Sequence, residues 1–126
     1  MMFHNLFQNW QDMVEFDAQT VIFSAGEPAE ILYFIISGEI ELHLHGRSLS
    51  IQSTGGIIGA MAMLPSATHS TTATSRSSVK LARIDQAQLK ELVAGNAEFS
   101  LYMMAALANR LRDADKLIAG QFEPKE

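Results

Sequence analysis

Residues 23–40 read Phe-Ser-Ala-Gly-Glu-Pro-Ala-Glu-Ile-Leu-Tyr-Phe-Ile-Ile-Ser-Gly-Glu-Ile, and this stretch decides the fold. The run from Ile31 to Ser37 is apolar, β-branched and aromatic, which is typical of a strand. Turn signals stand on both sides of it, at Gly26-Glu27-Pro28 and at Ser37-Gly38. The stretch therefore predicts strands separated by tight turns.

Short strands continue on both sides of this stretch. Runs rich in β-branched residues at 20–23, 40–45, 70–75 and 78–84 are separated by turn residues, and the last two meet near residues 76–77. Residues 39–45 alternate strictly, so Ile40, Leu42 and Leu44 are expected to face the core while positions 39, 41, 43 and 45 are solvated. Turns this closely spaced predict a sandwich or a small barrel-like roll.

Helical periodicity is present at both ends of the chain. Residues 3–13 carry apolar side chains at spacings of three and four, which predicts a short amphipathic helix. Asp85 and Gln88 fit a capping box that starts a second helix, and Gly95 is expected to end it in a left-handed conformation. The expected fold class is mainly β with helices (α+β): an N-terminal short helix, a β-roll and two C-terminal helices.

The last helix is predicted to run from about residue 97 to residue 119. Apolar residues repeat every three or four positions along one stripe, at Phe99, Met103, Leu107, Leu111, Ala114 and Ile118. A second apolar flank carries Leu101, Met104, Ala105 and Ala108. More than one apolar stripe has two explanations, a deep core position or a partner surface.

Composition excludes several classes of function. A chain of 126 residues is expected to form one domain, residues 1–126, and its net charge of −5 argues against a nucleic-acid partner. The basic residues Arg110, Arg112 and Lys116 alternate with acidic ones, which predicts a solvated helix face. The chain has no cysteine, no signal-peptide pattern and no apolar run of about 20 residues, so we expect no membrane partner and a cytoplasmic location.

Three segments together resemble one known family. Residues 23–40 are similar to its early strand-turn-strand signature, residues 56–64 to the apolar frame of its phosphate-binding cassette, and residues 106–111 to the start of its dimer helix. The family is that of the cyclic-nucleotide-binding domains of catabolite-activator-type regulators, protein kinase A regulatory subunits and gated channels. The resemblance implies a double-stranded β-helix, or jelly roll, with a cyclic-nucleotide pocket and dimerisation through the C-terminal helix.

The two charged anchors of the family pocket are replaced in this chain. Ala60 stands where the family has a glutamate for the ribose, and His69 stands where it has an arginine for the cyclic phosphate. The backbone N–H groups of Gly59, Ala60 and Met61 and the hydroxyls of Ser70 and Thr71 remain as ligand-binding candidates. Each lost charged hydrogen bond costs on the order of 1.5–3 kcal/mol, so tight cyclic-nucleotide binding is not expected.

Metal, haem and catalytic chemistry find little support in the sequence. His43 and His45 are predicted to share one strand face, but no carboxylate follows them at the spacing of a metal-binding roll, and a solvated face explains them. Seven methionines and four histidines show no spacing that indicates a haem site. No nucleophile elbow and no phosphate-binding loop is present, so we expect neither enzymatic activity nor a cofactor.

Two functions from different classes therefore stay open. The first is a small-molecule sensor or regulatory module with a degenerate pocket around Gly59, Ala60, Met61, His69, Ser70 and Thr71. The second is a protein-interaction or homodimerisation module that uses Leu101, Met104, Ala108 and Leu111. A residual cyclic-nucleotide-binding signalling role is a further alternative.

Overall fold

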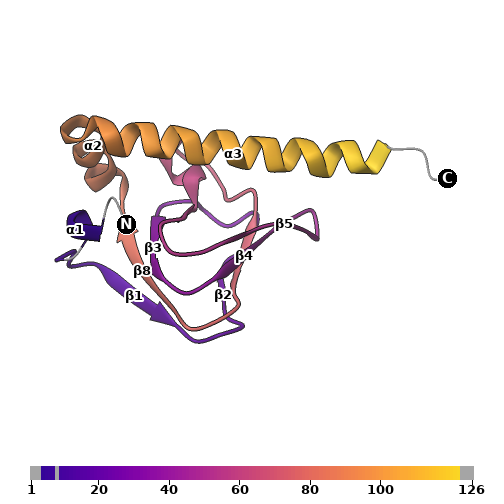
Figure 1. The fold of residues 1–126 in the computed structure, drawn as a ribbon, viewed down its shortest axis with the longest axis horizontal. Coiled ribbons are helices and arrows are strands. Elements are labelled where there is room, and N and C mark those ends of the chain that lie inside the picture. The colour runs from indigo at the N-terminus through magenta and orange to yellow at the C-terminus, as the bar shows by residue number, and fades with distance from the viewer. Residues whose placement is uncertain (1–3, 8, 123–126) are drawn as a thin grey trace.

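The computed structural model describes residues 4–7 and 9–122, which form two antiparallel sheets and the helices that cover them (Figure 1). The first sheet has the strand order β1-β8-β3-β6, made of Met13–Phe16, Val79–Ile84, Leu32–Ser37 and Ile57–Ile58. The second sheet has the order β2-β7-β4-β5, made of Val21–Phe23, Thr72–Ser75, Ile40–Leu44 and Arg47–Gln52. This mainly β roll with helices confirms the predicted fold class.

The first sheet is buried on both of its faces. One cluster lies between the two sheets and includes Ile35, Leu42 and Leu81. The other lies between the first sheet and the helices and includes Phe34 and Ile84. Because neighbouring side chains on a strand point to opposite faces, Phe34 and Ile35 serve different clusters, and the run around them is apolar throughout.

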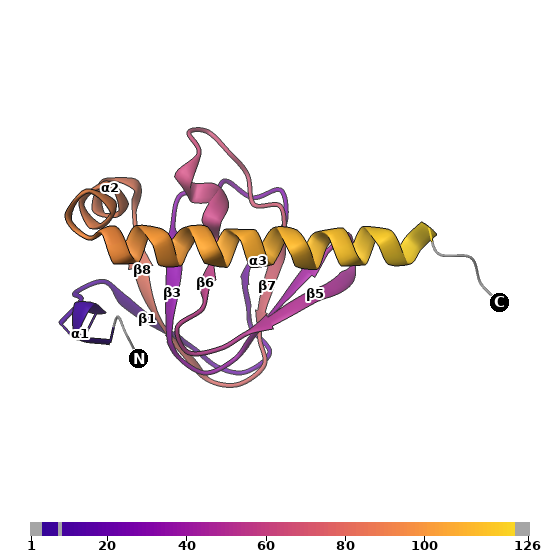
Figure 2. The ribbon, with the colours of Figure 1, turned by 45° about the horizontal axis from the view of Figure 1, so that its top comes forward.

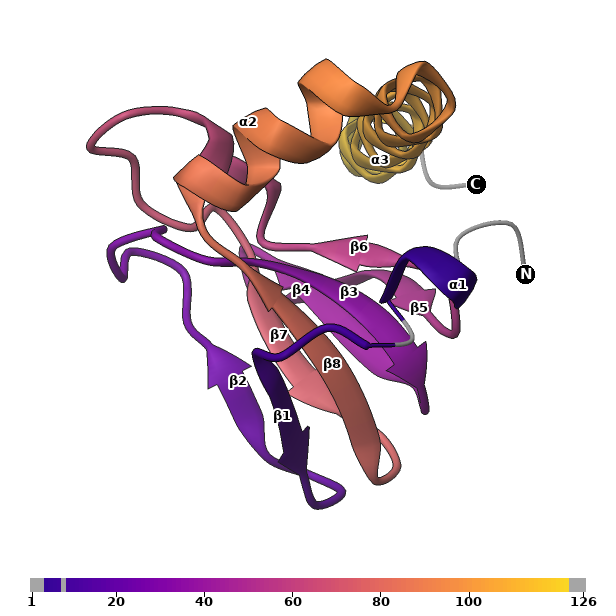
Figure 3. The ribbon, with the colours of Figure 1, turned by 90° about the vertical axis from the view of Figure 1, so that its left-hand side faces the viewer.

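The helices lie together on one side of the roll. They are α1 (His4–Phe7), the 3-10 turn η1 (Ala60–Met63), α2 (Gln86–Gly95) and α3 (Ala97–Phe122). Figures 1 and 2 show α3 running across the roll, with its C-terminal part reaching beyond the strands. Figure 3, in which α3 is seen nearly end-on, shows α2 and α3 above the sheets. None of the described helices is long and apolar enough to cross a membrane.

The N-terminal helix is much shorter than the predicted 3–13. Residue 3 lies outside the described residues, α1 ends at Phe7, and Met13 already belongs to β1, where it pairs with Ala82 of β8. The apolar spacing between them is real but not helical: Trp10 packs edge-on against Phe7 and its indole N–H donates to the carbonyl of Arg83 at 2.8 Å. Pairing with β8 replaces helical hydrogen bonds from residue 13 onward.

The junction between α2 and α3 is made by Asn96 rather than by Gly95. The capping box is present, since the Asp85 carboxylate accepts from the Gln88 N–H and the Gln88 amide oxygen accepts from the Asp85 N–H. Gly95, however, is the last residue of α2 and has no positive φ. Asn96 ends the helix in an extended conformation, and its side-chain oxygen accepts from the N–H of Phe99 at 3.0 Å, which starts α3.

The predicted apolar stripe of α3 is buried along only part of its length. Phe99 and Met103 are buried and Leu107 is half-buried, whereas Leu111 and Ile118 are 65% and 50% exposed. Of the two explanations left open, a deep core position within this chain therefore applies to Phe99 and Met103 but not to Leu111 and Ile118. Figure 2 shows that the C-terminal part of α3 extends past the strands.

Candidate ligand-binding site

Within the cassette segment, residues 56–64, the turn that leads into η1 requires a glycine at position 59. Gly59 has φ +79° and a Cβ there would lie 2.8 Å from the carbonyl oxygen of Ile31, so the site excludes side chains on two grounds. The backbone then enters η1, in which the N–H of Ala62 donates to the carbonyl of Gly59 at 3.0 Å. Ala60 and Met61, the next two residues, are half-buried.

A cavity of about 260 Å³ lies between this segment and α3. All six residues predicted for the ligand site line it, namely Gly59, Ala60, Met61, His69, Ser70 and Thr71. The remaining wall is Leu44, Leu49, Leu107, Arg110, Leu111 and Ala114. The structure thus brings the predicted residues together around one cavity, although their role in binding stays a prediction.

His69 takes part in the core rather than in a charged anchor. Its side chain is only 6% exposed and stacks on Phe23, with ring centroids 3.8 Å apart. Its backbone is fixed by two hydrogen bonds, from its N–H to the carbonyl of Glu27 at 2.9 Å and from the N–H of Gly26 at 2.8 Å. Burial lowers the pKa of His69, and the nearby Glu27 carboxylate offsets part of that effect, so the ring is neutral at pH 7.

Arg110, which was not among the predicted site residues, lines this cavity and also a second one of about 230 Å³ that Ile57 lines. Its guanidinium donates to the carbonyl of Ile57 in β6 at 2.8 Å and is partly buried. Burial lowers the pKa of Arg110 and the Asp113 carboxylate raises it, but an arginine keeps its charge in proteins. The prediction of a solvated face is wrong for Arg110, while Arg112 is exposed and bonds to Asn109 on the helix surface at 2.6 Å.

The signal that could have identified Arg110 is its place in the apolar stripe. It follows Leu107 by three residues and Met103 by seven, so it lies on the face of α3 that packs on the roll. The apolar stem of a basic residue on that face packs against the roll, which brings its guanidinium within reach of backbone carbonyls there. The neighbouring contact of Tyr102, whose hydroxyl donates to the carbonyl of Gly55, fixes the same face of α3 to the roll.

The residues predicted for dimerisation lie on the outer side of α3. Leu101, Met104 and Leu111 are 63%, 57% and 65% exposed, and Ala108 is also exposed. Leu111 additionally lines the mouth of the cavity. A deep core position within this chain is therefore excluded for Leu101, Met104 and Ala108 of the second apolar flank and for Leu111 of the first stripe.

His43 and His45 do not share a strand face. β4 ends at Leu44, and His45 lies in the turn with φ 52°, next to Gly46 with φ 77°. Positive φ at both central residues is the geometry of a two-residue hairpin. Among the described residues, no group of three or more histidines and carboxylates could hold a metal ion.

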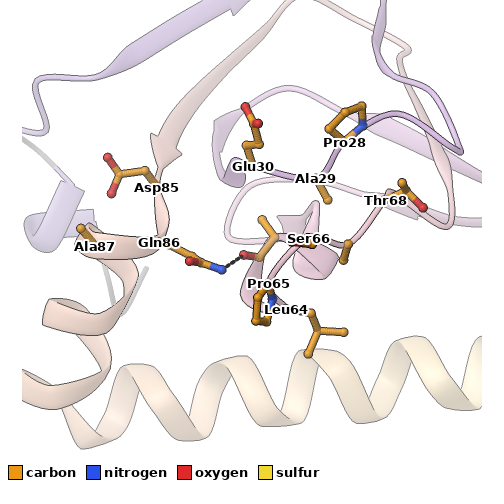
Figure 4. Close-up of a pocket in the computed structure, with 12 residues that line it drawn as sticks. Pro28, Ala29, Glu30, Leu64, Pro65, Ser66, Thr68, Asp85, Gln86 and Ala87 are labelled. Carbon is orange, nitrogen blue, oxygen red and sulfur yellow. Dashed lines mark hydrogen bonds between the residues drawn. The ribbon is translucent and has the colours of Figure 1, made fainter.

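A larger hollow, of about 700 Å³, lies beside η1. It shares no lining residue with the candidate cavity, although residues of the cassette segment line both. Figure 4 shows that its walls come from residues 28–30, from the loop at 64–68 and from the start of α2. The side-chain amide of Gln86 donates to the carbonyl of Ala62 at 3.2 Å, which ties α2 to η1. Glu30 and Asp85 give this hollow an acidic character, unlike the candidate cavity.

Comparison with known proteins gives a consistent result. Residues 13–96 match the family described as "Cyclic nucleotide-binding domain". The chain is 28% identical over 111 residues to a CRP-like cAMP-activated global transcriptional regulator of Mycobacterium tuberculosis, an alignment that covers 84% of this chain and 50% of that protein. The chain therefore spans about half the length of the curated relatives it matches first.

Solved structures share the fold along most of the chain. A c-di-GMP-responsive global regulator of Xanthomonas campestris superposes with a TM-score of 0.79 at 21% identity, over 91% of this chain and 61% of that one. The catabolite activator protein of Thermus thermophilus superposes with a TM-score of 0.74 at 25% identity, over 91% and 56%. The two sheets, the cassette turn and the match over residues 13–96 lead to one conclusion: this chain belongs to the cyclic nucleotide-binding domain family.

Proposed function

We propose that this chain is a non-enzymatic regulatory module that senses a small molecule other than cyclic AMP or cyclic GMP in the cavity under α3. The proposal rests on the side chains at positions 60 and 69, where the family has its two charged anchors. Ala60 has no polar side chain, and His69 is buried, neutral and stacked on Phe23. The regulatory character of the relatives, one of them a cAMP-activated transcriptional regulator, supports the sensor role.

We further infer that residues 1–126 form one domain, in which helix α3 joins the cavity to the region beyond the roll. Phe7, Leu92 and Phe99, from three different helices, share one apolar cluster with the strands of the first sheet. α3 both walls the cavity and continues beyond the roll. A ligand that contacts α3 can therefore change the position of this helix and of the surface that it presents beyond the roll.

The test is the thermal unfolding midpoint with and without cyclic AMP or cyclic GMP at about 1 mM. A ligand at about 100 times its dissociation constant stabilises a protein by about 2.7 kcal/mol, which would raise the midpoint by about 10 °C. We expect a rise of no more than about 2 °C. The double variant Ala60→Glu, His69→Arg, if it folds, should increase the rise because it restores both charged groups.

One outcome would overturn the proposal. If the unmodified protein bound either cyclic nucleotide with micromolar affinity, and Ser70→Ala or Thr71→Ala abolished that binding, the backbone and hydroxyls would be sufficient anchors. The chain would then be an ordinary cyclic-nucleotide sensor.

A second candidate function is homodimerisation or protein interaction through α3. The observation that favours it is the exposure of Leu101, Met104 and Leu111 on one helix, since large apolar side chains gathered on a surface mark interaction sites. The two functions are compatible, because Leu101 and Met104 do not line the cavity, although Leu111 belongs to both surfaces.

A further inference from the structure

The candidate cavity has a mainly apolar wall that includes one arginine and two hydroxyl-bearing residues. Its walls are mainly apolar, with Leu44, Leu49, Met61, Leu107 and Leu111 as the larger side chains. None of the described residues that line it is acidic, and Arg110 is the one that carries a permanent positive charge. An apolar cavity with a few placed polar groups is the usual form of a ligand site.

Arg110 is held in position without being neutralised. Its hydrogen bond to the carbonyl of Ile57 uses one of five N–H donors of the guanidinium. Within the described residues no carboxylate forms an ion pair with it, since the ion pairs found there join His43 to Glu41 and Arg83 to Asp12. Asp113 is near enough to influence its charge but does not line the cavity.

Two hydroxyl groups complete the polar side of the cavity. Ser70 and Thr71 line it next to His69, and neither hydroxyl has a hydrogen-bond partner among the described residues. A planar guanidinium matches a carboxylate with two parallel hydrogen bonds, and neighbouring hydroxyls can donate to the same oxygens. The neutral His69 adds no second charge, so the site matches a single negative charge better than a doubly charged phosphate.

The size of the cavity points to a compact ligand. At about 260 Å³ it lies just below the range of about 300–1,000 Å³ that is usual for ligand pockets. A purine nucleotide needs room for a base, a sugar and a phosphate, whereas a monocarboxylate with a six-membered ring or a short alkyl chain needs much less. The apolar residues that line the cavity would contact the ring or alkyl chain of such a ligand.

We propose that the cavity binds a compact monocarboxylate with an apolar body, and that Arg110 of α3 is the residue that holds the carboxylate. This rests on the proposed function, which it deepens by naming the ligand class. It places the charge recognition on the long helix rather than on the cassette loop. Binding would therefore tighten the attachment of α3 to the roll.

The experiment is titration calorimetry of the full chain with phenylacetate and hexanoate, compared with phenylacetamide and hexanamide. We expect both acids to bind and the matched neutral amides to bind at least tenfold more weakly, because they lose the charged hydrogen bonds. Arg110→Ala should weaken acid binding by at least tenfold and leave amide binding unchanged. Arg112→Ala, on the solvent side of the same helix, should change neither.

Thermal unfolding separates a binding defect from a folding defect. Should Arg110→Ala unfold, Arg110→Lys keeps the charge but loses the two-bond geometry, and we expect it to bind the acids more weakly than the unmodified protein does. Equal binding of acids and amides, unchanged binding by the Arg110 variants, or no binding of either acid would each overturn the inference. Cyclic AMP measured alongside keeps the two proposals distinct, since tight cyclic AMP binding contradicts the proposed function and absent acid binding contradicts only this inference.

Discussion

At the scale of the residue, His69 makes the stability of the protein depend on pH. Because burial lowers its pKa in the folded chain, the unfolded chain, where histidine titrates near pH 6.5, binds the proton more readily. The contribution of neutral His69 is therefore complete above about pH 6.5 and is lost as the pH falls from there through the folded-state pKa. We expect urea unfolding to show this loss in the unmodified protein and a weaker pH dependence in His69→Gln.

The unmodified protein must be compared with His69→Gln because other groups also titrate. Glu41, for example, has a lowered pKa from its hydrogen bond with Ser48, but it titrates identically in both. Parallel pH dependences of the two unfolding free energies between pH 7.5 and pH 5.5 would contradict the role assigned to His69.

Two glycines that look alike in the sequence have opposite requirements. Gly59 has a positive φ and faces the Ile31 carbonyl, so Gly59→Ala should destabilise the fold by about 1–3 kcal/mol. Gly95 is helical with open space around it, so Gly95→Ala should stabilise α2 by about 0.5–1 kcal/mol. Chemical denaturation measures both. A loss of stability in Gly95→Ala would mean that Gly95 does end α2 in a left-handed conformation.

At the scale of the element, local signals were reliable where local contacts decide the structure. The start of α2 was predicted because a capping box lies within four residues, and β3 because its apolar run is bounded by turns. β1 was not predicted, since its strand conformation comes from pairing with β8, far along the chain. β5 has a mixed sequence, Arg-Ser-Leu-Ser-Ile-Gln, and its pairing with β4 rather than its own pattern makes it a strand.

The residues of the candidate site also fall into those that local sequence predicts and those that depend on distant contacts. Its six predicted residues could be named because they lie in two short stretches, 59–61 and 69–71, at positions implied by the family resemblance, and the structure brings all of them to one cavity. The place of Arg110 in the apolar stripe indicates the face it lies on, but its partner, the carbonyl of Ile57, belongs to another element and could not be predicted. Charges nearby in the sequence suggested solvent, whereas the register of α3 on the roll decides which of them points inward.

At the scale of the whole molecule, the exposed flank of α3 predicts self-association. Leu101 and Met104 are mostly exposed, and a second copy of α3 packed against them would remove this apolar surface from water. We expect sedimentation velocity at tens of micromolar to give a dimer, and Met104→Lys to shift it to monomer because a buried ammonium lacks a partner there. Val21→Lys, a matched change at an exposed apolar residue of β2, should leave the dimer intact. A monomeric unmodified protein would contradict the predicted dimer. Equal effects of Met104→Lys and Val21→Lys would show that the interface does not lie on α3.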